Sequence, residues 1–191
     1  PKCAELLDRL PDRVDGLVRA ELADPAPKGA AVWRNTADER VTLRCGAPVP
    51  VQYTELSATE DIDGVTWVRV NDTTEGSDLS TWFAVGRTPV VAVTADASRA
   101  DAIGDLSEAM LPDAEIGDAP APNPVPLTDL EAPQADGRCS AVLAALPKTI
   151  GERERVEDAD LPEGSVVWAD EAGSVISLRC GLAEPAGYEG T

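Results

Sequence analysis

The sequence predicts an α+β fold, in which a mostly antiparallel sheet has its helices on one face and is stapled by disulfide bonds. Three observations lead to this prediction. Apolar residues recur at helical spacing in some segments and alternate in others, as in amphipathic helices and half-buried strands. Four cysteines are present, and "VTLRCGAPVP" (residues 41–50) is echoed by "ISLRCGLAEP" (residues 176–185). The expected order is αβββββα, linker, αββ, with a partial internal repeat.

The internal repeat places the four cysteines at corresponding positions in its two copies. The two copies align at an offset of 136 positions before a one-residue gap and 135 after it, which matches Cys3 with Cys139 and Cys45 with Cys180. Further matches are Pro11 with Pro147, Gly16 with Gly151, Gly29 with Gly164 and Trp33 with Trp168. The repeated unit is predicted to be helix, strand, strand.

Each copy is expected to begin with a helix. One apolar face is formed in the first copy by Cys3, Leu6, Leu7, Leu10, Val14 and Leu17, and in the second by Cys139, Val142, Leu143, Leu146 and Ile150. Because Pro11 lies inside this pattern, the helix either stops near Leu10 or bends there.

Strands follow each helix. "AAVWR" (30–34) and "SVVWA" (165–169) read as strands, and Val41, Leu43 and Cys45 alternate in the next one, with the cysteine inward and Arg44 outward. The first copy continues with strands at 64–70, 80–87 and 89–95, an exposed loop at 71–78, and a helix at 100–111. Ile103, Leu106 and Met110 form the apolar face of that helix.

Three regions are expected: a first αβ unit (1–111), a linker (112–137) and a shorter αββ unit (138–191). The middle region holds six prolines and six acids, which is typical of an extended linker. Two strands and a helix make a thin domain with an open sheet edge. Either the second copy packs against the first unit, or the native chain is longer.

Cys3, Cys45, Cys139 and Cys180 allow three disulfide connectivities. The repeat favours one bond per copy, Cys3 to Cys45 and Cys139 to Cys180. Such bonds persist in oxidising compartments, so an exported protein is predicted, with its signal already removed or outside the sequence. The alternatives are four buried thiols in a cytosolic domain, or a zinc site, against which the spread of the cysteines and the absence of histidine argue.

Charge and composition exclude several partners. The net charge of −19 repels nucleic acid and anionic lipid surfaces, and no apolar run is long enough to span a membrane. Three lysines against thirteen arginines indicate either a high-GC bacterial coding bias or a halophile. We therefore expect a protein or envelope component as the partner, and neither nucleic acid nor a transmembrane segment.

The absence of histidine excludes the Ser-His-Asp and Cys-His nucleophile systems and the commonest general base. No phosphate-binding loop or dinucleotide fingerprint occurs, so no cofactor is expected. Hydrolysis of glycosides by two carboxylates needs no histidine, so this chemistry is not excluded. Its candidate clusters, Glu60, Asp61 and Asp63 and then Glu157, Asp158 and Asp160, read as solvated loop charge, and neither has the spacing of a calcium loop.

Four further residues are candidates for an interaction surface. Arg44 and Arg179 occupy matching strand positions, where they either bridge to a neighbouring strand or reach a ligand. Trp82 and Phe83 are adjacent on a strand and so face opposite ways, which predicts that one of them is exposed. Trp33 and Trp168, in contrast, are interpreted as core anchors.

The segments "CAELLDRLP", "VW", "LRCG", "IDGVTWV" and "TWFAVGRTPVVAV" resemble, in this order, the actinobacterial exported proteins and lipoproteins grouped as domain of unknown function 3515. The resemblance covers residues 3–112, and its N-terminal portion recurs at 139–188. It implies an envelope location and a lipid anchor upstream of the sequence, but no activity or catalytic residue. Cys3 resembles a lipidated cysteine, yet its counterpart Cys139 lies deep in the chain, which favours disulfides.

The functional prediction is a non-catalytic extracytoplasmic module, secreted or associated with the cell envelope, that binds a protein or envelope component. The alternative is a carboxylate-dependent hydrolase acting on an envelope glycan. A hydrolase predicts a cleft with two facing acids, whereas a binding module predicts an open sheet surface.

Overall fold

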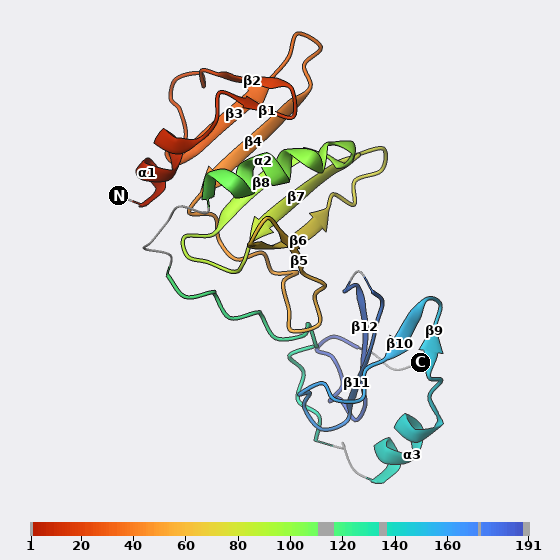
Figure 1. Ribbon diagram of the computed structural model, residues 1–191. Helices are drawn as coiled ribbons and strands as arrows, with labels where there is room; N and C mark the ends of the chain where they lie inside the picture. The colour runs from red at the N-terminus through yellow and green to blue at the C-terminus, as the bar shows by residue number, and fades with distance from the viewer. Residues whose placement is uncertain (1, 111–116, 134–136, 172, 189–191) are drawn as a thin grey trace. The chain divides into compact units, whose positions relative to one another are not determined.

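The computed structural model describes residues 2–110, 117–133, 137–171 and 173–188 (Figure 1). The chain forms two compact units, and each is discontinuous in sequence. The first unit comprises residues 1–53 and 59–122, and the second comprises residues 54–58 and 123–191. Residues 117–122 of the predicted linker therefore belong to the first unit and residues 123–133 to the second.

The first unit is an eight-stranded sheet with α1 (Lys2–Arg9) and α2 (Asp101–Met110). The strand order is β1-β2-β3-β4-β8-β7-β6-β5, and every neighbouring pair is antiparallel. The strands are β1 (Arg13–Val14), β2 (Leu17–Ala20), β3 (Ala30–Arg34), β4 (Arg40–Cys45), β5 (Glu60–Ile62), β6 (Val65–Asn71), β7 (Leu79–Ala84) and β8 (Val91–Asp96). A short 3-10 turn, Ala97–Arg99, leads from β8 into α2.

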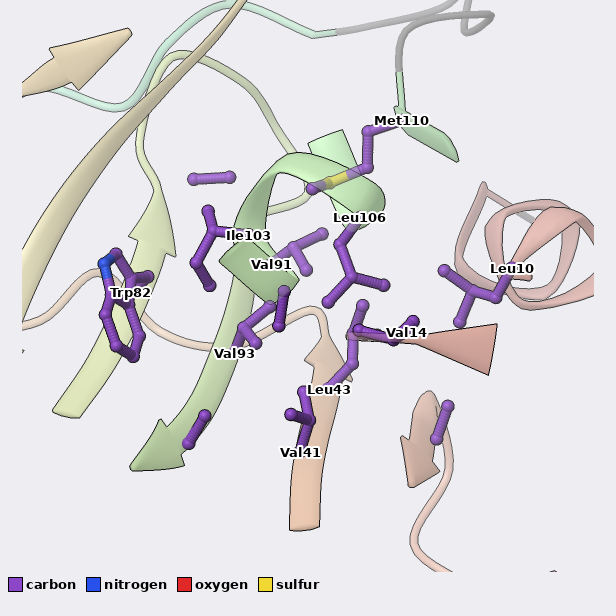
Figure 2. Close-up of a cluster of buried hydrophobic side chains, with 14 of the residues drawn as sticks. Leu10, Val14, Val41, Leu43, Trp82, Val91, Val93, Ile103, Leu106 and Met110 are labelled. Carbon is purple, nitrogen blue, oxygen red and sulfur yellow. The ribbon is translucent and has the colours of Figure 1, made fainter. Parts of the chain in front are cut away.

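The core of the first unit lies on one face of this sheet. Leu10 beyond α1 and Leu106 of α2 belong to one buried cluster with Val14, Val41 and Val93 of the strands (Figure 2). Within this core the Trp67 indole N–H donates to Ser107 Oγ at 3.0 Å, which satisfies both buried polar groups. The prediction of helices on one face of an antiparallel sheet is confirmed.

The second unit contains α3 (Gly137–Ala145) and a four-stranded antiparallel sheet in the order β12-β11-β10-β9. Its strands are β9 (Thr149–Ile150), β10 (Arg153–Arg155), β11 (Ser165–Ala169) and β12 (Val175–Arg179). The buried apolar residues described in this unit are Val125, Cys139, Val166, Val167 and Trp168. This core is much smaller than that of the first unit, and β12, which matches β4, is an edge strand.

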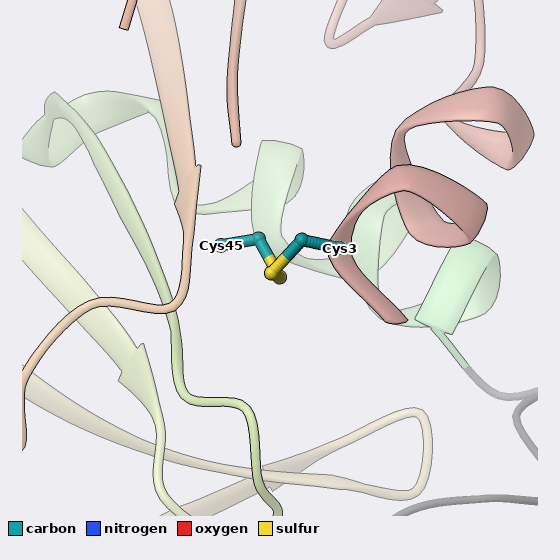
Figure 3. The surroundings of a disulfide bond; sticks show 2 residues. All are labelled: Cys3 and Cys45. Carbon is teal, nitrogen blue, oxygen red and sulfur yellow. A yellow bond between two sulfur atoms is a disulfide. The ribbon is translucent and has the colours of Figure 1, made fainter. Parts of the chain in front are cut away.

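Both copies close their own disulfide. Cys3 of α1 bonds Cys45 at the end of β4 (Figure 3), and Cys139 of α3 bonds Cys180 just after β12. The bonds span 42 and 41 positions. The predicted pairing of one staple per copy is therefore confirmed.

The repeat also preserves a set of hydrogen bonds. The indole N–H of Trp33 donates to the Pro11 carbonyl at 2.8 Å, and that of Trp168 donates to the Pro147 carbonyl at 3.0 Å. Both indoles are buried, as predicted for core anchors. Likewise, Arg19 donates to the Leu7 carbonyl at 3.0 Å, and its counterpart Arg155 donates to the Leu143 carbonyl at 2.9 Å. These bonds fasten the end of each helix to the sheet.

The structure corrects the extent of the first helix. It ends at Arg9, so Pro11 stops the helix rather than bending it. Val14 and Leu17 are buried as expected, but they lie in the hairpin of β1 and β2. The second copy has the corresponding hairpin of β9 and β10, and β5 is also additional to the prediction. The predicted helix-strand-strand repeat is thus a helix followed by four strands.

The hairpins also shift the alignment of the two copies. Val14 pairs with Leu17, and Ile150 pairs with Arg153, which keeps the offset of 136 through both hairpins. Gly151 therefore matches Asp15, whose φ is also positive, rather than Gly16. The one-residue gap falls between the hairpin and the next strand.

None of the helices in the described part of the chain has both the length and the apolar character needed to cross a bilayer.

Candidate functional site

A pocket of about 420 Å³ lies in the first unit between α2 and the strands β5, β6 and β7. We call it the α2 groove. Its size falls within the range of small-ligand sites. It is lined by Glu60, Ile62, Asp63, Arg69, Trp82, Ala100, Asp101, Gly104, Asp105 and Glu108.

The two walls follow from local structure. In α2, Asp101, Asp105 and Glu108 are spaced by four and three residues, so they lie on one helical face. The opposite face carries the buried Ile103 and Leu106. A helix this amphipathic packs its apolar side on the sheet and directs its carboxylates outward.

The strand wall is set by cross-strand register. Arg69 of β6 pairs directly with Trp82 of β7, so the two side chains share the helix-covered face. Glu60 of β5 pairs with Trp67 and joins the same face. Gly104 of α2 allows close approach here, because a Cβ at this position would lie 3.2 Å from Asp63 Oδ2.

Arg69 is held in one orientation by its neighbours. Its Nε donates to Ser80 Oγ at 3.1 Å, and the Ser80 hydroxyl in turn donates to Asn71 Oδ1 at 2.9 Å. The guanidinium carbon lies 5.0 Å from the centre of the Trp82 ring, within the range of a cation–π interaction. The guanidinium is therefore pre-organised to bind an acceptor group in the groove.

Five carboxylates line the groove together with this one guanidinium: Glu60, Asp63, Asp101, Asp105 and Glu108. All five side chains are exposed to solvent. Asp105 Oδ2 also accepts a hydrogen bond from the Asp15 backbone N–H at 2.8 Å. This arrangement favours a cationic group, since the surplus of negative charge attracts an ammonium.

Asp15 connects the groove to an ion-pair network. Arg99 contacts Asp15 Oδ2 at 2.6 Å and Glu39 Oε2 at 2.7 Å. The hydrogen bond to Asp15 raises the pKa of Arg99 above its ordinary value, and the charge of Glu39 adds to this effect. The network joins the β1–β2 turn, the β3–β4 turn and the residues that lead into α2.

The structure brings together only some of the residues singled out in the sequence. Trp82, Glu60 and Asp63 meet at the α2 groove, although Trp82 is buried at 2% exposure beneath Arg69. Phe83 faces the opposite side of the sheet and is half-buried. The expectation that one of these two aromatic residues is exposed is therefore wrong.

The two matching arginines have different environments. Arg44 points outward from β4 and is exposed. Arg179, in contrast, is half-buried and donates to the carbonyls of Thr128 and Leu130 at 2.8 and 3.0 Å. Arg179 therefore holds an extended segment of its own unit.

The second acidic cluster, Glu157, Asp158 and Asp160, lies in a loop after β10 with its side chains exposed. Glu157 contacts Arg155 at 3.7 Å. This position fits the interpretation of solvated loop charge. Across the residues with described positions, no group of three or more acidic or cysteine side chains is arranged to hold a metal ion.

Sequence reasoning missed Arg69 and the carboxylates of α2. The spacing of Asp101, Asp105 and Glu108 is visible in the sequence and predicts one polar helical face. The position of Arg69 over Trp82 has no comparable local signal, because it depends on the register of β6 against β7.

The fold and groove define a disulfide-stapled α+β module made of two related units. The chain matches the family described as "Protein of unknown function (DUF3515)" over residues 1–115 and again over residues 110–191, and it belongs to this family. The predicted resemblance is thus confirmed, with one match on each copy of the repeat. No curated protein and no solved structure matches the chain.

Proposed function

We propose that this protein is a non-catalytic extracytoplasmic module that binds a protein or another component of the cell envelope, with the α2 groove as its binding site. The observation that carries the proposal is one pocket lined by the pre-organised Arg69 and five exposed carboxylates. The carboxylates attract an ammonium, and the guanidinium donates hydrogen bonds to a carboxylate or carbonyl oxygen. A peptide carrying lysine-like amines fits this pattern.

We favour binding over hydrolysis because the carboxylates of the α2 groove are exposed to solvent. The general acid of a glycoside hydrolase is a carboxyl whose surroundings keep it protonated, commonly through burial. The groove does have carboxylates on both walls, as a hydrolase requires, but each one is exposed.

The extracytoplasmic location is supported by the two disulfides, which use all four cysteines. Fractionation of the native cells followed by thiol alkylation tests it. We expect the protein in the envelope or medium with no reactive thiol. Recovery from the cytoplasm with alkylated cysteines would overturn the location.

The groove is tested by an NMR titration of the whole chain with trilysine and with fully acetylated trilysine. We expect trilysine to shift the amide signals of α2 and β5, and acetylated trilysine to leave them unchanged. The double variant Glu60→Gln with Glu108→Gln should bind trilysine roughly fivefold more weakly, because two screened charge pairs are lost. The matched control, Glu152→Gln with Glu163→Gln, removes two exposed charges from the second unit.

Equal weakening in both double variants would reject the groove as the site. The hydrolase alternative has its own test, incubation with isolated cell-wall glycan. Release of new reducing ends by the native chain, lost in the Glu60→Gln and Glu108→Gln variant, would replace the binding proposal with hydrolysis.

A further inference from the structure

A row of arginines crosses the sheet of the first unit on the face opposite the helices. Arg13 of β1 pairs with Val18 of β2, Val18 pairs with Arg34 of β3, and Arg34 pairs with Arg40 of β4. Paired residues point to the same face, so the four side chains lie side by side across the strands. We call Arg13, Arg34 and Arg40 the arginine row; at about 4.8 Å per strand it spans about 14 Å.

These three arginines are exposed, and none of their side chains has a hydrogen bond or ion pair to any residue that the structure describes. This is unexpected in a chain with 35 acidic and 16 basic residues. Arg19, Arg99, Arg155 and Arg179 all donate hydrogen bonds to other parts of the chain. Moreover, Arg34 and Arg40 are directly opposite each other, a like-charge pair that disfavours the fold.

The surface between the charges is apolar. Val18, at the centre of the row, is 47% exposed. Ala20 and Val32, which pair with each other one step along the same strands, are half-buried on the same face. An open depression of about 660 Å³ adjoins the row and is lined by Val18, Ala20, Arg34 and the turn between β3 and β4.

We infer that the arginine row binds an extended acidic segment of a partner protein, in which two carboxylates flank an apolar side chain. In an extended segment, side chains four residues apart share a face and lie about 13 Å from each other, which matches the length of the row. The middle side chain of that face meets Val18. Each guanidinium binds a carboxylate through paired N–H donors.

Other anions fit the surface less well. A polyphosphate has no apolar group to cover Val18. An anionic membrane would attract the arginine row but repel the molecule as a whole, whose net charge is −19. A protein segment supplies both the carboxylates and the apolar contact, and it touches only the strands of the row.

The test is an NMR titration of the whole chain at low salt with the peptide acetyl-Asp-Ser-Val-Ser-Asp-amide. We expect shifts in the arginine Nε–H signals and weaker binding as salt rises. The triple variant Arg13→Gln, Arg34→Gln, Arg40→Gln should lose roughly tenfold or more in affinity. The matched control, Lys28→Gln, Arg138→Gln, Lys148→Gln, removes the same charge from exposed positions elsewhere and should bind like the native chain.

Equal loss in both triple variants would show general charge attraction and overturn the inference. So would stronger binding of the native chain to polyphosphate or to phosphatidylglycerol vesicles than to the peptide. A second measurement separates binding from a structural role. Arg40→Thr relieves the like-charge pair, so its Tm should equal or exceed the native value, and a lower Tm would mean that the row serves the fold instead.

Discussion

At the scale of single residues, one glycine shapes the loop before β3, and another shapes the corresponding loop before β11. Gly29 has φ +76°, and its carbonyl accepts the Cys45 backbone N–H at 2.8 Å. Gly164 has φ +81° and accepts the Cys180 N–H at the same distance. The glycines place the loop against the backbone of the disulfide-bonded strand.

Gly29→Ala is expected to destabilise the first unit by about 2 kcal/mol or more, because it adds backbone strain and a steric clash. The new Cβ would lie 2.8 Å from the Cys45 carbonyl oxygen. Urea unfolding measures the change. Gly16→Ala is the matched control, since Gly16 also has φ +76° but has nothing within 4 Å of an added Cβ. If the two variants lose equal stability, the contact with Cys45 has no effect.

At the scale of elements, the hairpin of β6 and β7 is closed by a carboxylate. Asp72 accepts hydrogen bonds from the Thr74 backbone N–H at 2.9 Å and from the Ser77 hydroxyl at 2.7 Å. The bonds from Thr74, and then that from Ser77, lower the pKa of Asp72 below its ordinary value of 3.8. The loop at 71–78 is exposed, as the sequence predicts.

A lowered pKa in the folded state means that ionised Asp72 stabilises the hairpin. This stabilisation is fully present above the unfolded pKa near 3.8 and is lost as the pH falls through the lower folded pKa. Asp72→Asn should therefore lose less stability than the native chain on acidification from about pH 4 to about pH 2. Urea unfolding across this range measures it, and parallel losses in the two proteins would contradict the assignment.

Elements differ in how far the sequence predicts them. The strands β3, β4, β6, β7 and β8 and the helix α2 are long enough for alternation or helical spacing to identify them. The strands β1, β2, β5, β9 and β10 have two to four residues, too few to establish a period. Val14 and Leu17 also fit the helical spacing of Leu10, so only Pro11 separates the helix from the hairpin.

The two proposed sites depend on pairing between strands that no local pattern reveals. Arg69 meets Trp82, and Arg34 meets Arg40, because of the registers of β6 with β7 and β3 with β4. The disulfides were predictable for a different reason. The duplication supplies two copies of one helix-to-strand geometry, so each copy limits the pairing of the other.

At the scale of the whole molecule, the two units have unequal reserves of stability. The first unit buries a broad sheet face under two helices, whereas the second has a small core and relies more on its staple. In the chain-entropy model, each disulfide contributes about 4 kcal/mol for a loop of this length.

Cys139→Ser with Cys180→Ser is accordingly expected to unfold the second unit and leave the first one folded. The NMR signals of residues 137–188 should collapse to unfolded positions, while the Trp67 and Trp82 indole signals persist. Cys3→Ser with Cys45→Ser is the comparison, and there the first unit should stay folded with a lowered Tm. A folded second unit in the absence of its disulfide would contradict this difference between the cores.

The discontinuity of the second unit affects how the protein responds to cleavage. The chain passes between the units at 53/54, at 58/59 and at 122/123. A protease that cuts once between residues 117 and 123 severs only the last passage, and the N-terminal fragment still carries residues 54–58 of the second unit. Thr54 bridges Asn123 in a parallel pair, and Gly173 lies against the backbone of Ser57 and Ala58. A nicked molecule can thus stay non-covalently assembled, and a fragment that starts at residue 123 lacks part of its own fold.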